Sequence, residues 1–300
     1  MHQAGPCSSQ CSSFNYDRPN LTGFFAYCES VSVARQESVF PDVIDWHSFP
    51  HHPNIPSDIF REAGEIKEAL HTQTTYYLNA DTLLSVSEAM GCEESMRPGT
   101  NLWALARAER AVEEGLTFMC RAVYDATSPE TCAPREPAGQ PFNKMNSLIE
   151  PDPESPYHLQ PRQAWYLYRD YASIRGMYVE ADSVGDFEVI AGYDTGPTRP
   201  VIIVGHRGTS GGALHLRLMG MDQFSGLAVE DLVHARVLKY SGDLNDAWPT
   251  HLTDADFVLD DLSHNYIVED GVLEISIGES VFDGPSAISI VLSPPAPSLA

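Results

Sequence analysis

The sequence predicts an α+β protein, with a helical N-terminal region followed by an antiparallel β-sandwich (jelly-roll-like) C-terminal domain. Apolar residues recur at helical spacing before residue 126, and seven prolines interrupt residues 127–160. Apolar and polar residues then alternate after Met177. We therefore expect a flexible arm at 1–20, a mainly helical region at 21–126, a proline-rich linker or extended arm at 127–160, a helix plus β-sandwich at 161–293, and a tail at 294–300.

The region before residue 126 contains the helical signals. Ser57 is placed to cap a helix, and a second helix is expected from Asp81 to Met90, ending at Gly91. The clearest helical pattern runs from Asn101 to Ala126. Residues 21–56 are rich in aromatic residues and proline, and their valines suggest an extended segment near Val31, Val33 and Val39.

The region after residue 160 begins with one helix and continues as strands. Pro161 suits the first turn of a helix that ends at Gly176, and Trp165, Tyr168 and Tyr171 share one face that we expect to cover a sheet. Asp270-Gly271 predicts a tight hairpin. Strands are expected at 178–181, 187–191, 201–204, 213–219, 233–240, 257–259, 266–268, 272–277 and 287–292.

Composition limits the classes of partner. The net charge of −24 argues against direct nucleic-acid binding and against binding to an anionic membrane. No signal peptide or membrane-spanning segment is recognised, so we expect a cytoplasmic or virion location. The sequence lacks the phosphate-binding and dinucleotide-binding glycine motifs, and no cofactor is predicted.

A glycine-rich segment, Gly208-Thr209-Ser210-Gly211-Gly212, fits the pattern of a serine nucleophile. Ser210 is followed by Asp260 and His264, the chain order of an α/β-hydrolase triad. The GTSGG run also resembles the nucleophile loop of chymotrypsin-like proteases, which would make Ser210 the nucleophile. The alternative, which we favour, is a hairpin loop whose glycines supply positive φ angles.

Three groups of residues have metal-ligand chemistry. Asp254, Asp256 and Asp260 lie in an acidic run that suits calcium, although a solvated face is the default interpretation. The segment DWHSFPHHP brings histidines close to an aspartate, which are ordinary metal ligands. Cys7, Cys11 and Cys28 suggest a zinc site. A proline-rich loop and a flexible tail are the simpler interpretations of the last two groups. The histidine-rich group consists of Asp45, His47, His51 and His52.

We expect, from these features together, a non-enzymatic structural or assembly protein, such as a capsid or tail-associated component of a virion. Extended arms and the absence of a convincing active site favour this class, whose partners would be copies of the chain or other assembly proteins. Two alternatives stay open. One is a β-sandwich that binds a glycan or peptide through aromatic residues such as Trp248 and Tyr266, and the other is a serine hydrolase.

Overall fold

Parallel and antiparallel sheets both occur in this chain, which is therefore a mixed α+β protein, as predicted. The chain divides into two compact units: Met1–Cys92 with Ala104–Tyr124 form unit 1, and Glu93–Trp103 with Asp125–Ala300 form unit 2. The computed structural model describes residues 16, 18–48, 58–73, 82–90, 97–121, 148–152, 155–193, 199–209, 211–224, 226–228, 231–241, 252–282 and 284–295.

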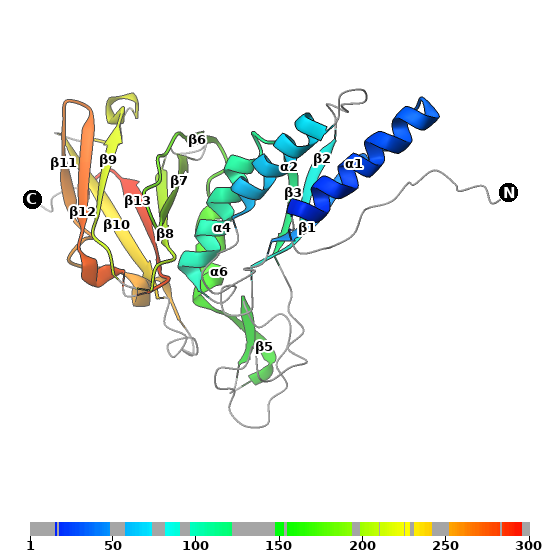
Figure 1. Ribbon diagram of the computed structural model, residues 1–300. Helices are drawn as coiled ribbons and strands as arrows, with labels where there is room; N and C mark the ends of the chain where they lie inside the picture. The colour runs from blue at the N-terminus through cyan, green and yellow to red at the C-terminus, as the bar shows by residue number, and fades with distance from the viewer. Residues whose placement is uncertain are drawn as a thin grey trace, which may run out of the picture. The chain divides into compact units, whose positions relative to one another are not determined.

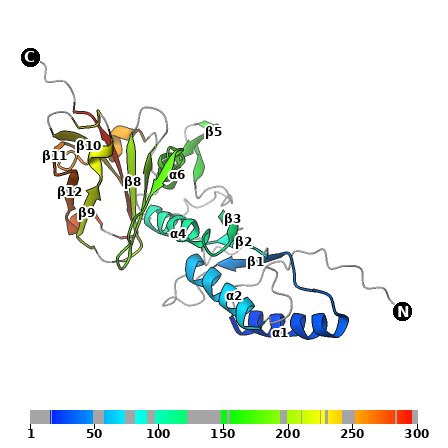
Figure 2. The same ribbon diagram turned by 90° about the horizontal axis from the view of Figure 1, so that it is seen from above.

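Unit 1 contains a parallel three-stranded sheet in the order β1-β2-β3, whose strands alternate with helices along the chain. The helices α1 and α2 pack side by side (Figures 1 and 2). The strands are β1 (Val43–Ser48), β2 (Leu83–Ala89) and β3 (Leu116–Arg121), and the helices are α1 (Arg18–Arg35), α2 (Ile59–Gln73) and α4 (Pro98–Ala111), the last with only its residues from Ala104 onward in unit 1.

The core of unit 1 lies between these helices and one face of the sheet. On β1, Ile44, Trp46 and Ser48 are buried and alternate with less buried neighbours. Asp58 precedes α2 and accepts a hydrogen bond from the backbone N–H of Arg61 at 3.2 Å, so it caps the helix. The predicted cap, Ser57, lies outside the described residues.

Three secondary-structure predictions for unit 1 are wrong. The segment predicted as a helix from Asp81 contains strand β2, because its buried residues alternate as they do in a strand. The helix predicted from Asn101 to Ala126 ends at Ala111, and Gly115, at φ +95°, turns the chain into β3. Val31 and Val33 lie in helix α1, where packing of Phe25 overrides their preference for strands, and Val39 follows the helix outside any strand.

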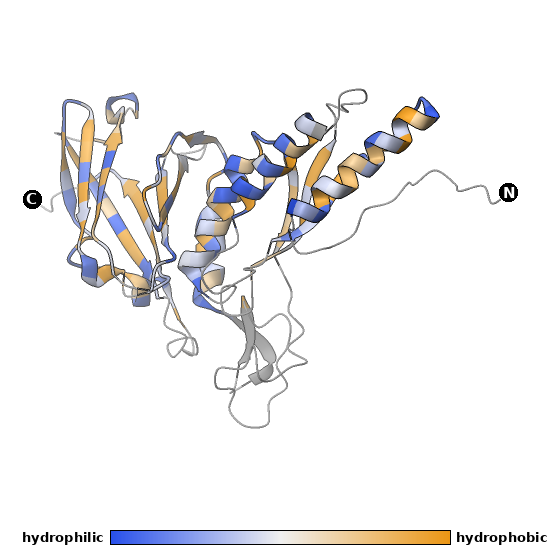
Figure 3. Cartoon of the chain, in the orientation of Figure 1, coloured by the Kyte–Doolittle hydropathy of each residue, from blue (hydrophilic) through white to orange (hydrophobic). Residues whose placement is uncertain are grey.

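Unit 2 contains an eight-stranded antiparallel sheet in the order β6-β7-β8-β13-β10-β11-β12-β9. Hydrophobic residues concentrate on its strands, as the colouring of β8 and β13 shows (Figure 3). The strands are β6 (Met177–Val179), β7 (Phe187–Tyr193), β8 (Pro200–His206), β9 (Leu214–Met219), β10 (Leu232–Tyr240), β11 (Asn265–Glu269), β12 (Val272–Ile277) and β13 (Ala287–Ser293).

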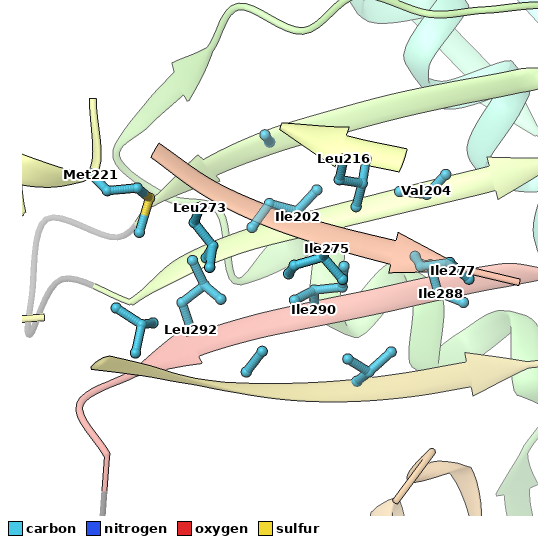
Figure 4. Close-up of a cluster of buried hydrophobic side chains, with 14 of the residues drawn as sticks. Ile202, Val204, Leu216, Met221, Leu273, Ile275, Ile277, Ile288, Ile290 and Leu292 are labelled. Carbon is cyan, nitrogen blue, oxygen red and sulfur yellow. The ribbon is translucent and has the colours of Figure 1, made fainter. Parts of the chain in front are cut away.

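The sheet of unit 2 curls so that its two halves enclose one hydrophobic core. Side chains from β8 and β13 point toward side chains from β9 and β12 (Figure 4). Ile202, Leu216, Leu273 and Ile290 are members of this buried cluster. The predicted alternation on β9 is confirmed, since Leu216 is buried between exposed His215 and Arg217.

The hairpin predicted at Asp270-Gly271 is confirmed. Both residues have positive φ angles, +50° and +73°, and they join the antiparallel strands β11 and β12. The strand expected at 257–259 is instead the end of a 3₁₀ helix, η3 (Asp254–Phe257), followed by a single bridge from Val258 to Leu238.

Two other expectations for unit 2 need correction. The proline-rich region expected to lack regular structure contains an antiparallel pair, β4 (Ile149–Asp152) and β5 (Ser155–Pro161). Helix α6 (Gln163–Ala172) buries Ala164, Leu167 and Asp170, while Trp165, on the predicted packing face, is exposed. The predicted aromatic face therefore does not mark the buried side, which includes Tyr166 instead. Within the described part of the chain, no helix is both long and apolar enough to cross a bilayer.

Candidate functional site

Polar residues lie on β1 and β2 of unit 1 from the middle of each strand toward its carboxyl end. Asp45 and His47 alternate with the buried core residues of β1, so they lie on the face of the sheet away from that core. In parallel sheets, ligands bind at the edge formed by the carboxyl ends of the strands, because the connecting loops and side chains converge there. The carboxyl edge of this sheet is therefore the candidate site.

The register of the sheet brings residues from three strands into two rows. Asp45 pairs with Ser85, which in turn pairs with Phe118 on β3. A β-bulge follows, so that Ser87 is the extra residue of β2 and Glu88 pairs with His47. Bulges are common next to functional sites, and this one directly precedes the backbone position of Glu88.

Two buried polar atoms in this cluster have no hydrogen-bond partner among the described residues. They are one carboxylate oxygen of Asp45, Oδ1, and the hydroxyl oxygen of Ser87, Oγ. Buried polar atoms are nearly always hydrogen-bonded, and leaving one unsatisfied costs about 1–3 kcal/mol.

A second carboxylic acid, Glu62, lies on the opposite, core side of β1. The indole N–H of Trp46 donates to Glu62 Oε2 at 3.0 Å, and the backbone N–H of Asp58 donates to Oε1 at 3.3 Å. Burial raises the pKa of Glu62 above its ordinary value, although these hydrogen bonds act in the opposite direction. Because Glu62 is fully enclosed by the core, we assign it a structural role.

The structure does not test the predicted serine-hydrolase triad. Ser210 lies outside the described residues, so the triad stays an untested prediction. His264 is exposed and stacks on the ring of Tyr266, with ring centroids 4.2 Å apart, and Asp260 is an exposed residue before it.

The glycines around Ser210 are needed for space and not for a positive φ. A Cβ on Gly211 would lie 2.7 Å from the carbonyl oxygen of Glu279, and one on Gly208 would lie 2.7 Å from the His206 ring. Neither glycine has a positive φ angle, so the predicted reason for them is wrong. The loop packs so closely against its neighbours that only glycine fits.

The aspartates predicted as a calcium site have other partners. Asp254 accepts from Arg169 at 2.5 Å and lies 3.5 Å from an Arg236 nitrogen. Asp256 accepts from the backbone N–H and the hydroxyl of Thr253, and these hydrogen bonds lower its pKa. Across the residues that the structure describes, no three histidine, cysteine or acidic side chains form a metal-binding group.

The histidine-rich segment, considered as a metal site, is described only in part. His51 and His52 lie outside the described residues, whereas Asp45 and His47 belong to β1. Of the cysteines considered for zinc, Cys7 and Cys11 also lie outside them, and Cys28 is buried in α1. Glu88 was missed, and the available signal was its place directly after the alternating segment Leu84-Ser85-Val86-Ser87.

No protein-family model matches this sequence, and no curated protein matches it either. Solved structures do resemble the fold. N2152 from Neocallimastix frontalis is 16% identical with a TM-score of 0.60, and the match covers 94% of this chain and 60% of that one. An α-L-arabinofuranosidase from Thermotoga maritima, in an arabinose complex, is 10% identical with a TM-score of 0.53, and the match covers 94% and 57%.

A third structure, described as an arabinofuranosidase, is 9% identical with a TM-score of 0.51, and the match again covers 94% of this chain and 57% of that one. The chain therefore spans about three fifths of the length of the structures it resembles. At these identities the likeness concerns the fold alone.

Proposed function

We propose that this chain acts on carbohydrates, with a glycan bound at the carboxyl edge of the β1-β2-β3 sheet. The observation that carries the proposal is the placement of Asp45 and Glu88 on neighbouring parallel strands, where Asp45 Oδ1 and Ser87 Oγ lack partners among the described residues. The fold likeness to arabinofuranosidases supports the same class of ligand. This proposal replaces the non-enzymatic role as our preferred hypothesis.

Asp45 and Glu88 have the chemistry that glycoside hydrolysis requires. One carboxylic acid protonates the oxygen of the glycosidic bond as that bond breaks. The other, as a carboxylate, either takes a proton from the attacking water or attacks the anomeric carbon itself. We assign the two roles to this pair jointly, and we assign hydrogen bonding to sugar hydroxyls to His47 and Ser87.

We also propose that the curled sheet of unit 2 is a jelly-roll-like β-sandwich. The support is the single core that its two halves enclose, in which β8 and β13 face β9 and β12 (Figure 4). The predicted aromatic ligand site on this sheet has weaker support. Tyr266 is partly buried and its hydroxyl donates to the Leu262 carbonyl at 3.0 Å, and Trp248 lies outside the described residues.

Hydrolysis of a panel of aryl glycosides that includes an aryl α-L-arabinofuranoside tests the proposed activity. We expect measurable turnover by the full chain and a loss of about 10²-fold or more in Glu88→Gln and in Asp45→Asn, because each variant removes acid–base chemistry. Glu68→Gln is the matched control, since Glu68 is an exposed carboxylate on α2. No turnover by the wild-type chain, or equal rates in all three variants, would contradict the proposal.

An assembly role is the second candidate, and one observation favours it. Leu83 is 45% exposed and Phe118 is 56% exposed on the β1-β2-β3 sheet, although parallel sheets are normally covered on both faces. Another chain that covered this face would bury them. Light scattering of the full chain tests the assembly role. A stable oligomer would support it, and a monomer would contradict it. The virion setting rests on the sequence alone.

A further inference from the structure

A groove opens in unit 2 where the two ends of the curled sheet approach each other. Its volume is about 650 Å³, which is within the usual range for ligand sites. We call it the β7–β9 groove. Its lining includes Phe187 and Val189 on β7, Leu216 and Leu218 on β9, and Val179 and Glu180 at the end of β6.

One wall of this groove is an open strand edge. Strand β9 ends the sheet order and pairs only with β12 among the described strands. The other wall is β7, which pairs with β6 through Ala191, Gly192 and Tyr193 and bridges to Val184 at Phe187. An exposed edge presents backbone N–H and C=O groups to any extended chain that lies along it.

The floor of the groove is apolar and its rim has a net negative charge. Ile202 and Leu292 reach the groove from the core, and Met219 at its edge is 71% exposed. Arg217 lies 3.8 Å from a carboxylate oxygen of Glu274, which offsets its positive charge.

Glu180 and Asp182, both exposed, therefore set the net sign of the rim. The whole chain, at −24, adds a long-range attraction for positively charged partners.

We propose that the β7–β9 groove binds an extended, apolar and basic segment of a partner protein, which pairs with β9 as an added strand. Backbone hydrogen bonds to the β9 edge would supply affinity, and alternate apolar side chains would enter the groove. Lysine or arginine side chains of the segment would meet Glu180 and Asp182. This site is in unit 2 and is independent of the proposed carbohydrate site in unit 1.

Fluorescence anisotropy of the full chain with a labelled nonapeptide of alternating valine and lysine tests the proposal. We expect saturable binding, about tenfold weaker binding of a valine–glutamate peptide, and loss of binding when the valine–lysine peptide is N-methylated at alternate residues along one edge. N-methylation removes strand donors but keeps charge and hydrophobicity. Equal binding of the N-methylated peptide would overturn strand addition.

Charge reversal at the rim locates the site. The double variant Glu180→Lys/Asp182→Lys should bind the valine–lysine peptide about tenfold more weakly than the wild type does. The control Asp260→Lys/Asp261→Lys changes net charge equally at exposed residues outside the groove lining and should bind like the wild type. Equal weakening in both double variants would mean general electrostatic attraction and would contradict the assignment.

Amide hydrogen exchange provides a second readout that does not depend on these variants. Bound peptide should slow exchange in β9 and leave β10, in the interior of the sheet, unchanged. Slowing elsewhere with no change in β9 would overturn the proposal. So would light scattering that shows a dimer dissociated by Met219→Lys, because a second copy of the chain would then occupy the edge.

Discussion

Glu62 shows how one buried carboxylic acid links the stability of unit 1 to pH. Its side chain is fully buried and receives hydrogen bonds from Trp46 and from the backbone of Asp58. Because burial raises its pKa, the folded protein holds the proton more tightly than the unfolded chain does. Ionised Glu62 therefore destabilises the fold increasingly as pH rises above the ordinary pKa of 4.5.

We predict that Glu62→Gln becomes more favourable to folding, relative to the wild type, as pH rises from about 4.5 to about 8. Glutamine keeps an acceptor for Trp46 but does not ionise. Urea unfolding of both proteins at a series of pH values measures the difference in unfolding free energy. A difference independent of pH, or one that grows toward acid, would show that the burial argument is wrong. Glu68→Gln, at an exposed carboxylate, should show no such trend.

Two helical glycines differ sharply in their surroundings. Gly99, in the first turn of α4, donates its N–H to the Pro285 carbonyl at 3.0 Å. A Cβ there would lie 2.1 Å from the His206 carbonyl oxygen and 2.4 Å from that of Ser286. Gly64, within α2, would place a Cβ in open space.

We predict that Gly99→Ala lowers the free energy of unfolding by about 3 kcal/mol, because backbone atoms have to move away from the added methyl group. Gly64→Ala should instead raise it by about 0.5–1 kcal/mol, because alanine is the better helix former and nothing obstructs it. Thermal or chemical unfolding of each variant checks both signs. A neutral Gly99→Ala would mean that this approach of backbones is not close.

Local sequence predicted the antiparallel strands of unit 2 well and the parallel strands of unit 1 poorly. Strands β9 and β12 alternate apolar and polar residues, so a period of two identifies them. Strand β3 follows helix α4 after only a few residues, and Leu116 and Met119 happen to continue its helical spacing. Only the positive φ at Gly115 separates the two, and a single glycine is a weak signal.

The candidate site could be predicted only in part, for the same reason. The sequence identified Asp45 and His47 as candidate metal ligands, because they lie close together along the chain. Their pairing with Ser85 and Glu88 is a long-range property of the parallel sheet, and no pattern within β1 reveals it. The reason for the glycines near Ser210 could not be predicted either, because their close contacts involve residues distant in the sequence, such as Glu279.

The charge of the whole molecule also makes a prediction. A net charge of −24 destabilises the compact state through self-repulsion, and dissolved salt screens that repulsion. We predict that raising NaCl from about 20 mM to about 300 mM raises the melting temperature, because the exposed ion pairs that salt weakens contribute little each. Differential scanning calorimetry measures this, and a lower melting temperature in salt would contradict it.

The central claim is that a glycan binds at the carboxyl edge of the β1-β2-β3 sheet. Carbodiimide labelling of the full chain, read by peptide mass spectrometry with and without arabino-oligosaccharides, tests it without depending on turnover. With the sugar near saturation, amidation of Asp45 and Glu88 should slow about tenfold, while Glu68 and Asp260 react unchanged. Unchanged labelling of Asp45 and Glu88, or protection confined to unit 2, would contradict the account.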